Sequence, residues 1–124
     1  MDVYKTKSFA RFMRRQKITD EALSEAVERA SRGLIDADLG GGVIKQRVPR
    51  PGQGRAGGFR TIMLFRTESR AIFVDGFAKS EQDNIGDDDV LLFRELASEF
   101  LSYDEAQAAR LVETGAWIEV DYGD

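Results

Sequence analysis

The chain has 124 residues and a net charge of −4, and 42% of its residues are hydrophobic. This length fits a single domain, which we expect to span residues 1–124. The sequence contains no cysteine and no histidine, which excludes disulfides, the common zinc sites and catalysis by imidazole. Because no apolar run approaches the roughly 20 residues of a membrane span and no secretory signal is recognisable, we expect a cytoplasmic protein without membrane contact.

Two helices are expected in the first third of the chain, after a short strand at residues 3–4. Phe9 and Met13 have helical spacing and are surrounded by arginines and lysines. Thr19 has the character of an N-cap for a second helix with one apolar stripe, and Gly33 can take the left-handed position that follows a helix. The pattern therefore predicts a helical hairpin.

The next segment changes to the alternation that is typical of β-strands. Residues 43–48 place Lys45 and Arg47 on one face, because side chains two apart in a strand point the same way. Residues 49–58 are rich in proline and glycine, which favours a loop. Residues 59–66 then form the returning strand. The pattern predicts a β-hairpin with a long loop.

A third strand is expected over residues 71–78, after a tight turn at residues 68–70. Its alternation predicts that Phe73, Asp75 and Phe77 lie on one face, with Asp75 as the single polar member. Aromatic residues at this spacing are more typical of a core than of a surface that stacks bases. The three strands are expected to form a small antiparallel sheet of about three to four strands.

The C-terminal part is expected to contain two helices and a short strand. Asp87 is predicted to cap the first helix, which should bury an apolar side that includes Leu92. Ser102 and Glu105 have the spacing of a capping box for the second, and residues 117–120 resemble a short strand. The predicted fold class is α+β, with an N-terminal helical hairpin packed against a small antiparallel sheet and C-terminal helices.

Charge is distributed unevenly along the chain. Residues 42–70 hold seven Lys or Arg residues and a single Glu, whereas residues 71–124 hold three basic residues and fourteen carboxylates. A local positive potential attracts a polyanion even when the whole protein is acidic. The functional site is therefore expected within residues 41–84, the stretch that contains this basic tract.

Three stretches carry a family resemblance, together with the helix ELASEFLS and the tail WIEV: KTKSFARFMRRQKITDEAL, DADLGGGVIKQRVPRPGQGRAGGFRTIMLFR and FVDGFAKSEQDNI. In these stretches, which cover nearly the whole chain, the sequence resembles the RelE/HigB-like toxins of bacterial type II toxin–antitoxin modules. The resemblance implies a RelE-like fold whose sheet has a basic concave face. It also implies an endoribonuclease that cuts mRNA in the ribosomal A site, although similar ParE-type proteins inhibit DNA gyrase and cut nothing.

The same resemblance implies the site residues. Four basic residues stand at the places of the family's cleavage pattern and are predicted to be catalytic: Lys45, Arg47, Arg60 and Lys79. Three further arginines of the basic tract are predicted to bind RNA: Arg50, Arg55 and Arg66. Many members also use a tyrosine, or a histidine and an aspartate, near the C-terminus; this chain has no histidine, and none of its three tyrosines closely follows the third strand. Without the resemblance, residues spaced like Lys45 and Arg47 are more often the solvent-facing side of an edge strand.

Cleavage of RNA through its 2′-hydroxyl needs a proton acceptor, a proton donor and positive charge over the phosphate. Arg47 and Arg60 suit the charge role, because guanidinium groups pair with phosphate through two hydrogen bonds. Lys45 is the candidate base, since a lysine crowded by arginines loses its proton more easily. Neither Lys45 nor Arg60 is expected in the core. The proton donor stays open among three residues: Lys79, Glu81 and Asp83.

Two functions are therefore carried forward. The first is a ribosome-dependent mRNA endoribonuclease that inhibits translation and needs no metal or other cofactor. The second is a non-cleaving protein of the RelE/ParE fold that acts as a gyrase inhibitor or as an antitoxin's co-repressor. The expected partners are a helix-turn-helix antitoxin, the ribosome and its mRNA, with operator DNA contacted only through the antitoxin complex.

Overall fold

The computed structural model describes residues 1–50, 58–78 and 85–122. Its helices are α1 (Lys7–Gln16), α2 (Asp20–Ser31), α3 (Asp87–Phe100) and α4 (Glu105–Thr114). Its strands are β1 (Asp2–Thr6), β2 (Ala37–Gly40), β3 (Val43–Val48), β4 (Phe59–Arg66), β5 (Arg70–Ala78) and β6 (Trp117–Glu119). Within these residues no helix has both the length and the apolar character that a membrane crossing requires.

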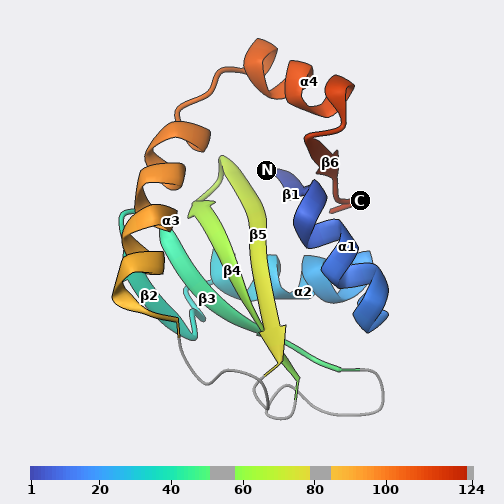
Figure 1. The fold of residues 1–124 in the computed structure, drawn as a ribbon, viewed down its shortest axis with the longest axis vertical. Helices are drawn as coiled ribbons and strands as arrows, with labels where there is room; N and C mark the ends of the chain where they lie inside the picture. The colour runs from blue at the N-terminus through green and yellow to red at the C-terminus, as the bar shows by residue number, and fades with distance from the viewer. Residues whose placement is uncertain (51–57, 79–84, 123–124) are drawn as a thin grey trace.

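All six strands form one mixed sheet in the order β2-β3-β4-β5-β1-β6 (Figure 1). The antiparallel pairing of β3, β4 and β5 agrees with the prediction, whereas β1 runs parallel to β5. The α+β class is confirmed, but the predicted three to four strands are too few. The error arises because β1 and β6 are short and join the sheet through pairing with distant segments, and because β2, which pairs with the neighbouring β3, was not recognised as a strand. The backbone N–H of Val120, for example, donates to the carbonyl of Val3 at 2.9 Å.

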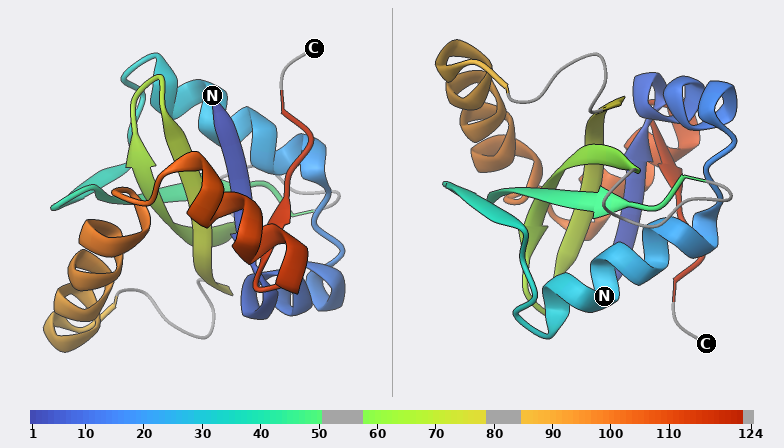
Figure 2. Two further views of the ribbon diagram at one scale, coloured as in Figure 1. Left: turned by 90° about the horizontal axis from the view of Figure 1, so that it is seen from above. Right: turned by 90° about the horizontal axis from the view of Figure 1, so that it is seen from below.

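Helices cover both faces of the central strands. Helices α1 and α2 lie on one side and α3 on the other, while α4 lies beside β6 at one end of the sheet (Figures 1 and 2). Under α1 and α2 the core contains Phe9, Leu23 and Met63. On the opposite side, Ile62 and Leu64 belong to a second core cluster beneath α3 and α4. We call these two sides the hairpin face and the α3 face.

The predicted N-terminal helical hairpin is confirmed. Helix α1 begins after Thr6, whose side chain accepts a hydrogen bond from the backbone N–H of Phe9. Helix α2 begins after Thr19, whose side chain accepts from the N–H of Ala22 at 3.2 Å. Gly33 follows α2 with a φ of 82°, the left-handed conformation that glycine adopts without strain.

The predicted caps of the two C-terminal helices are wrong. Gly86 occupies the N-cap of α3 without a side-chain hydrogen bond, and Asp87 is already helical. The aspartates of this first turn instead place negative charge at the positive end of the helix dipole. Helix α4 has a capping box made by Asp104 and Gln107 rather than one that starts at Ser102. The hydroxyl of Ser102 donates back into α3, to the carbonyl of Glu99.

Helix α3 covers the sheet with its C-terminal half. Ala97 is its buried residue, and the side chain of Arg94 donates to the carbonyl of Leu39 in β2. Leu92, predicted to face inward, is 62% exposed and that prediction is wrong. The reason is the position of the helix, which contacts β3 and β4 near the turn at Gly42. Leu92 lies earlier in the helix, before this contact, and stays exposed.

A β-bulge in β5 changes which side chains share a face. Ile62 of β4 pairs with Asp75, but its neighbour Met63 pairs with Phe73, so Val74 is an extra residue in the ladder. Phe73 therefore packs in the core of the hairpin face, and Asp75 points to the α3 face. The prediction that these two residues share a face is wrong, because strict alternation fails where a strand gains one residue.

Candidate functional site

The pairing of β3, β4 and β5 arranges six residues on the α3 face in two rows across the strands: Arg47, Arg60 and Phe77 in the first, and Lys45, Ile62 and Asp75 in the second. Residues that are directly paired in an antiparallel sheet share a face, with neighbouring strands about 4.8 Å apart. We call these six residues the two-row surface. Three of the four residues predicted to be catalytic thus lie together on it.

Arg60 is the most unusual member of the two-row surface. Its side chain is buried, with 7% of the residue exposed, and its Nη1 atom has no hydrogen-bond partner among the described residues. The expectation that Arg60 lies outside the core is wrong, because β4 is a central strand flanked by β3 and β5. A buried guanidinium nitrogen without an acceptor is unfavourable. An anion such as a phosphate group would supply the missing acceptor.

Arg47 lies at the end of β3 with its backbone anchored and its side chain exposed. Its backbone N–H donates to Oδ2 of Asp36 at 2.7 Å, and its carbonyl accepts from Nη2 of Arg29. Arg29 also forms an ion pair with Asp36 at 3.5 Å. These contacts fix the end of β3, which extends past the last residue that pairs with β2. The guanidinium of Arg47 therefore extends from a fixed backbone, beside Lys45.

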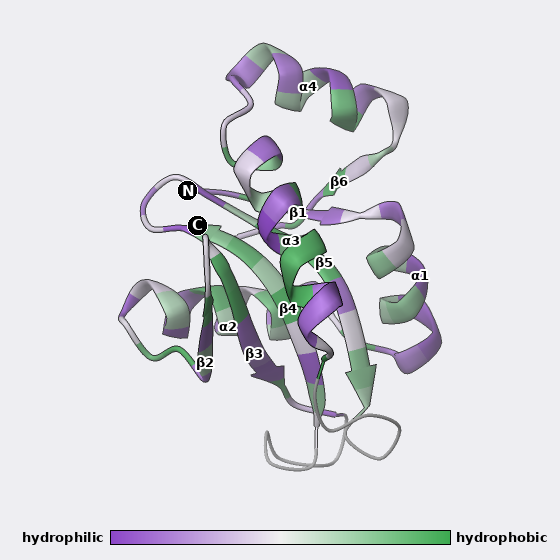
Figure 3. Ribbon diagram, turned by 60° about the vertical axis from the view of Figure 1, so that its left-hand side comes forward, coloured by the Kyte–Doolittle hydropathy of each residue, from purple (hydrophilic) through white to green (hydrophobic). Residues whose placement is uncertain are grey.

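Gln46 fixes the orientation of β3, and its role was not recognised from the sequence. It is fully buried on the hairpin face, where its Nε2 donates to the carbonyls of Ala26 and Leu34. Its Oε1 accepts from the backbone N–H of Asp36 at 2.7 Å, and its carbonyl accepts from the hydroxyl of Thr61. Because Gln46 points towards α2, the basic residues on either side of it must point to the α3 face. The colouring of β3 in Figure 3 shows this end of the strand as hydrophilic and the other half as hydrophobic.

Asp75 brings a carboxyl group to the same surface. Partial burial raises the pKa of this carboxyl, and the negative charge of Asp89 in the first turn of α3 raises it further. A hydrogen bond with the backbone of Gly76 acts in the opposite direction. Asp75 was noted in the sequence only as a polar residue in an apolar strand. The bulge at Val74, which turns it towards the basic residues, has no local sequence signal.

A comparison with protein families shows to which family the chain belongs. Residues 1–120 match the family model described as the RelE toxin of the RelE/RelB toxin–antitoxin system. The protein belongs to the RelE toxin family. The match covers nearly the whole chain, so the resemblance seen in the sequence is confirmed and a toxin role with an antitoxin partner follows. No curated protein sequence matches the chain.

The remaining basic residues predicted for this RelE-family toxin are placed differently from one another. Arg50 lies over the ring of Phe59, with its guanidinium carbon 4.7 Å from the ring centroid, and Phe59 belongs to the core of the hairpin face. Arg66 lies at the opposite end of β4 from Arg60, and its Nη1 donates to the carbonyl of Leu101 at 2.8 Å. The structure therefore separates Arg66 from the two-row surface. Its predicted role in RNA binding stays a prediction.

Four other residues named from the sequence lie outside the described residues: Arg55, Lys79, Glu81 and Asp83. Their predicted roles in RNA binding and in catalysis stay predictions. The described part of the RelE-family toxin thus brings together Lys45, Arg47 and Arg60, and adds Asp75.

The tyrosines of the described residues lie away from the two-row surface. The rings of Tyr4 and Tyr103 pack on Trp117, with centroids 5.0 and 5.9 Å from it. The hydroxyl of Tyr103 donates to the carboxylate of Glu99, and this hydrogen bond raises the pKa of Tyr103. Tyr122 packs against the core of the hairpin face. A tyrosine therefore does not serve the two-row surface in this conformation.

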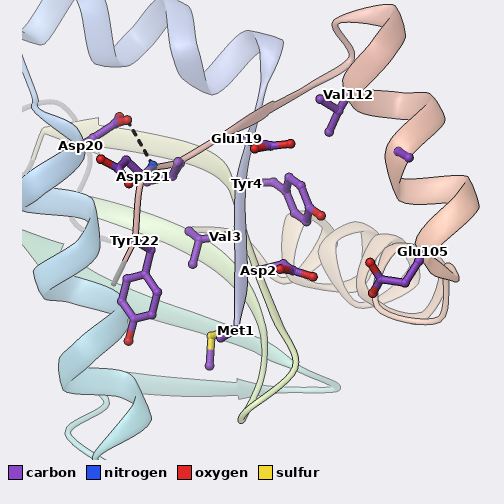
Figure 4. A pocket seen from close by; sticks show the side chains of 12 residues that line it. Met1, Asp2, Val3, Tyr4, Asp20, Glu105, Val112, Glu119, Asp121 and Tyr122 are labelled. Carbon is purple, nitrogen blue, oxygen red and sulfur yellow. Dashed lines mark hydrogen bonds between the residues drawn. The ribbon is translucent and has the colours of Figure 1, made fainter. Parts of the chain in front are cut away.

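A separate cavity of about 680 Å³ lies between β1, β6 and α4 (Figure 4). Five carboxylates line it: Asp2, Asp20, Glu105, Glu119 and Asp121. Such a lining repels nucleic acid, so this cavity does not extend the basic surface. Over the described ranges of the chain, no group of three or more acidic side chains is arranged to hold a metal ion.

Proposed function

We propose that this RelE-family toxin is a ribosome-dependent mRNA endoribonuclease that inhibits translation. The observation that supports it most directly is Arg60, whose buried Nη1 has no hydrogen-bond partner in the described chain. Arg47 lies directly opposite and Lys45 is in the adjoining row. A concentration of positive charge around an unsatisfied donor fits a phosphate of the RNA backbone.

The proposed roles follow from the chemistry of cleavage through the 2′-hydroxyl. Lys45, in its neutral form, takes the proton of this hydroxyl, and the 2′ oxygen attacks the neighbouring phosphorus. Arg60 and Arg47 bind the phosphate oxygens, on which negative charge grows in the transition state. Lys79, predicted from the sequence to complete this set, is proposed to bind the same phosphate. The reaction needs no metal and no other cofactor.

Dependence on the ribosome follows from the limited set of proton-transferring groups. Holding the RNA in a reactive geometry is worth roughly 7–11 kcal/mol in favourable cases. We therefore expect the ribosomal A site to position the mRNA, and the isolated toxin to be a weak nuclease. The proposed setting is the cytoplasm, with ribosome and mRNA as targets.

The direct test is induced expression followed by mapping of transcript ends. We expect growth arrest and new 5′ ends within translated mRNA, at positions in register with the reading frame. Lys45→Ala should abolish both, whereas Arg110→Gln, which removes an exposed arginine of α4, should change neither. Arrested cells with intact transcripts would contradict the proposal.

A second candidate function is a non-cleaving inhibitor or co-repressor of the same fold. One observation favours it: Tyr4 and Tyr103 pack around Trp117 instead of facing the basic residues. Supercoiling assays with purified toxin distinguish the two functions. A gyrase inhibitor would block supercoiling without RNA cleavage, whereas a nuclease should leave gyrase turnover unchanged.

The antitoxin is proposed to be a small helix-turn-helix protein that covers the two-row surface. Acidic segments on it would complement Lys45, Arg47 and Arg60 and would prevent RNA from entering. Operator DNA would then be contacted only through the complex. Co-expression with the product of an adjacent small reading frame should relieve growth arrest, and an Arg47→Glu toxin should bind that product more weakly.

A further inference from the structure

We propose that Asp75 is a catalytic residue of the two-row surface, and that its carboxyl group gives a proton to the 5′ oxygen that leaves when the RNA strand is cut. The inference rests on the proposed endoribonuclease function, since a leaving oxygen exists only if the strand is cleaved. It identifies Asp75 as the proton donor, in place of the three candidates from the sequence, Lys79, Glu81 and Asp83.

The backbone places Asp75 in the row that contains the candidate base. Lys45 pairs with Ile62, and Ile62 pairs with Asp75, so the three cross the sheet in order on one face. Adjacent strands are about 4.8 Å apart, which puts the backbones of Lys45 and Asp75 about 10 Å from each other. A phosphodiester that spans the row can therefore meet a proton acceptor on one side and a donor on the other.

Arg60 lies between these two positions in the neighbouring row. It pairs with Phe77, two residues beyond Asp75 in β5, and such diagonal neighbours are roughly 7–8 Å apart. A phosphate that binds the buried Nη1 of Arg60 is thereby held next to Asp75. Along the surface, the phosphate-binding arginine lies between the candidate base and the candidate acid. In-line displacement requires this arrangement, because the entering and leaving oxygens lie on opposite sides of the phosphorus.

The bulge at Val74 is what makes this placement possible. Without the extra residue, Phe73 and Asp75 would share a face. The observed register instead places Phe73 in the core of the hairpin face and Asp75 on the two-row surface. Bulges of this kind re-aim side chains next to functional sites.

The surroundings of Asp75 favour its protonated form. Burial is the largest cause of its raised pKa, and Asp89 of α3 adds like-charge repulsion. The basic groups that face it from the sheet are Arg60 of β4 and, farther away, Lys45 of β3. A bound RNA phosphate adds negative charge beside the carboxyl and so favours the proton further. These surroundings raise the fraction of Asp75 that carries a proton above that of an ordinary exposed carboxylate.

The proposed step is balanced in protons and bonds. The 2′ oxygen loses its proton to the neutral amine of Lys45 and forms a bond to phosphorus. The bond from phosphorus to the 5′ oxygen breaks, its electron pair moves to that oxygen, and the carboxyl proton of Asp75 goes to it. The products are a 2′,3′-cyclic phosphate, a free 5′-hydroxyl, a lysine ammonium and an aspartate carboxylate. Exchange with water restores both groups.

The test measures single-turnover cleavage on ribosomes that carry a defined mRNA, with toxin in excess. Asp75→Asn should lower the cleavage rate by roughly 10²–10⁴-fold, as loss of a proton-transferring group does, and should leave ribosome binding unchanged. Asp75→Glu should retain part of the rate. Glu119→Gln, which removes a carboxylate from the distant acidic cavity, should cleave at the wild-type rate.

An mRNA whose leaving 5′ oxygen is replaced by sulfur separates acid catalysis from a structural role. A thiol has a pKa of about 8.5 and leaves as an anion without a proton. Asp75→Asn should therefore cleave this substrate as fast as the wild type does. The ratio of the wild-type rate to the Asp75→Asn rate on normal mRNA should fall as pH rises and Asp75 loses its proton, and Asp89→Asn in the wild-type background should move this fall to lower pH.

Each outcome decides between the two proposals. If the wild type fails to cleave mRNA on ribosomes, the endoribonuclease function itself is overturned. If the wild type cleaves and Asp75→Asn cleaves equally fast, only the role of Asp75 is overturned. Slow cleavage by a folded Asp75→Asn that sulfur does not rescue likewise overturns its role as proton donor. Thermal melting of each variant confirms that it is folded.

Discussion

Arg47 and Arg60 lie directly opposite each other in the antiparallel pair of β3 and β4. Two side chains in this relationship share a face, and like charges there repel. Arg60 is buried as well, with Nη1 unsatisfied among the described residues. An anion bound between the two would relieve this repulsion and satisfy the buried nitrogen, which is why we propose that a phosphate of the RNA binds at this pair.

The repulsion predicts that Arg47→Gln stabilises the isolated toxin. The free energy of unfolding should rise by roughly 0.2–1 kcal/mol, the usual size of a cross-strand charge effect. The gain should shrink in high salt, because salt screens the repulsion at the exposed Arg47 side chain. Urea unfolding at low and high ionic strength measures it. The exposed Arg32 offers the control: Arg32→Gln should not give the same salt-dependent gain.

The unsatisfied nitrogen predicts an anion effect that depends on Arg60. Inorganic phosphate should raise the melting temperature of the wild type, because a ligand that binds the folded state stabilises it. Arg60→Met replaces the buried guanidinium with an apolar chain of similar length, so it should remain folded, cease to respond to phosphate and lose toxicity. A differential scanning titration with phosphate, with chloride at equal ionic strength as control, measures the response. An equal response in Arg60→Met would place the bound anion elsewhere.

The hydrogen bonds of Gln46 predict a large loss of stability for Gln46→Leu. The substitution leaves two carbonyls and one backbone N–H without their partner. Each such group costs about 1–3 kcal/mol when it stays buried, so we expect a loss of at least about 3 kcal/mol in urea unfolding. Glu28→Ala, on the exposed side of α2, should change stability by less than about 0.5 kcal/mol. A small effect of Gln46→Leu would mean that water reaches these groups.

The raised pKa of Asp75 predicts that the stability of the toxin falls as the pH rises. Its folded-state pKa is raised above the ordinary value of 3.8, so the folded state binds the proton more tightly than the unfolded state does. Stability is therefore greatest below that value and falls as pH rises through the folded-state pKa. Asp75→Asn lacks this loss. Urea unfolding should show that it is more stable than the wild type at neutral pH, and the difference should vanish as the pH falls below 3.8.

The contact between Arg66 and the end of α3 predicts a loss of stability when Arg66 is replaced. Its Nη1 donates to the carbonyl of Leu101 at the end of α3, so Arg66→Ala should lower the free energy of unfolding by about 1 kcal/mol. Cleavage per folded molecule should fall less than in Lys45→Ala, because Arg66 lies at the far end of β4. A loss of ribosome binding by folded Arg66→Ala would instead support the RNA-binding role predicted from the sequence.

Errors in the prediction of the fold have both local and tertiary origins. The helical hairpin was predictable because Thr19 and Gly33 mark helix ends by local conformation, and β3 because its side chains alternate. The capping box at Ser102 was wrong because Asp104 competes for the same helix end within two residues. The inward face of Leu92 was wrong because an apolar helix side does not reveal where the helix crosses the sheet.

The sequence by itself determined that Lys45 and Arg47 share a face, since the two-residue period of a strand is a local property. It also determined the family, because the residues that carry the resemblance run through nearly the whole chain. Only the tertiary structure decided that Arg60 is buried opposite Arg47 and that a bulge at Val74 turns Asp75 towards both. Strand register and bulges depend on pairing between segments that are distant in sequence. Burial depends on which side chains those segments place around a residue.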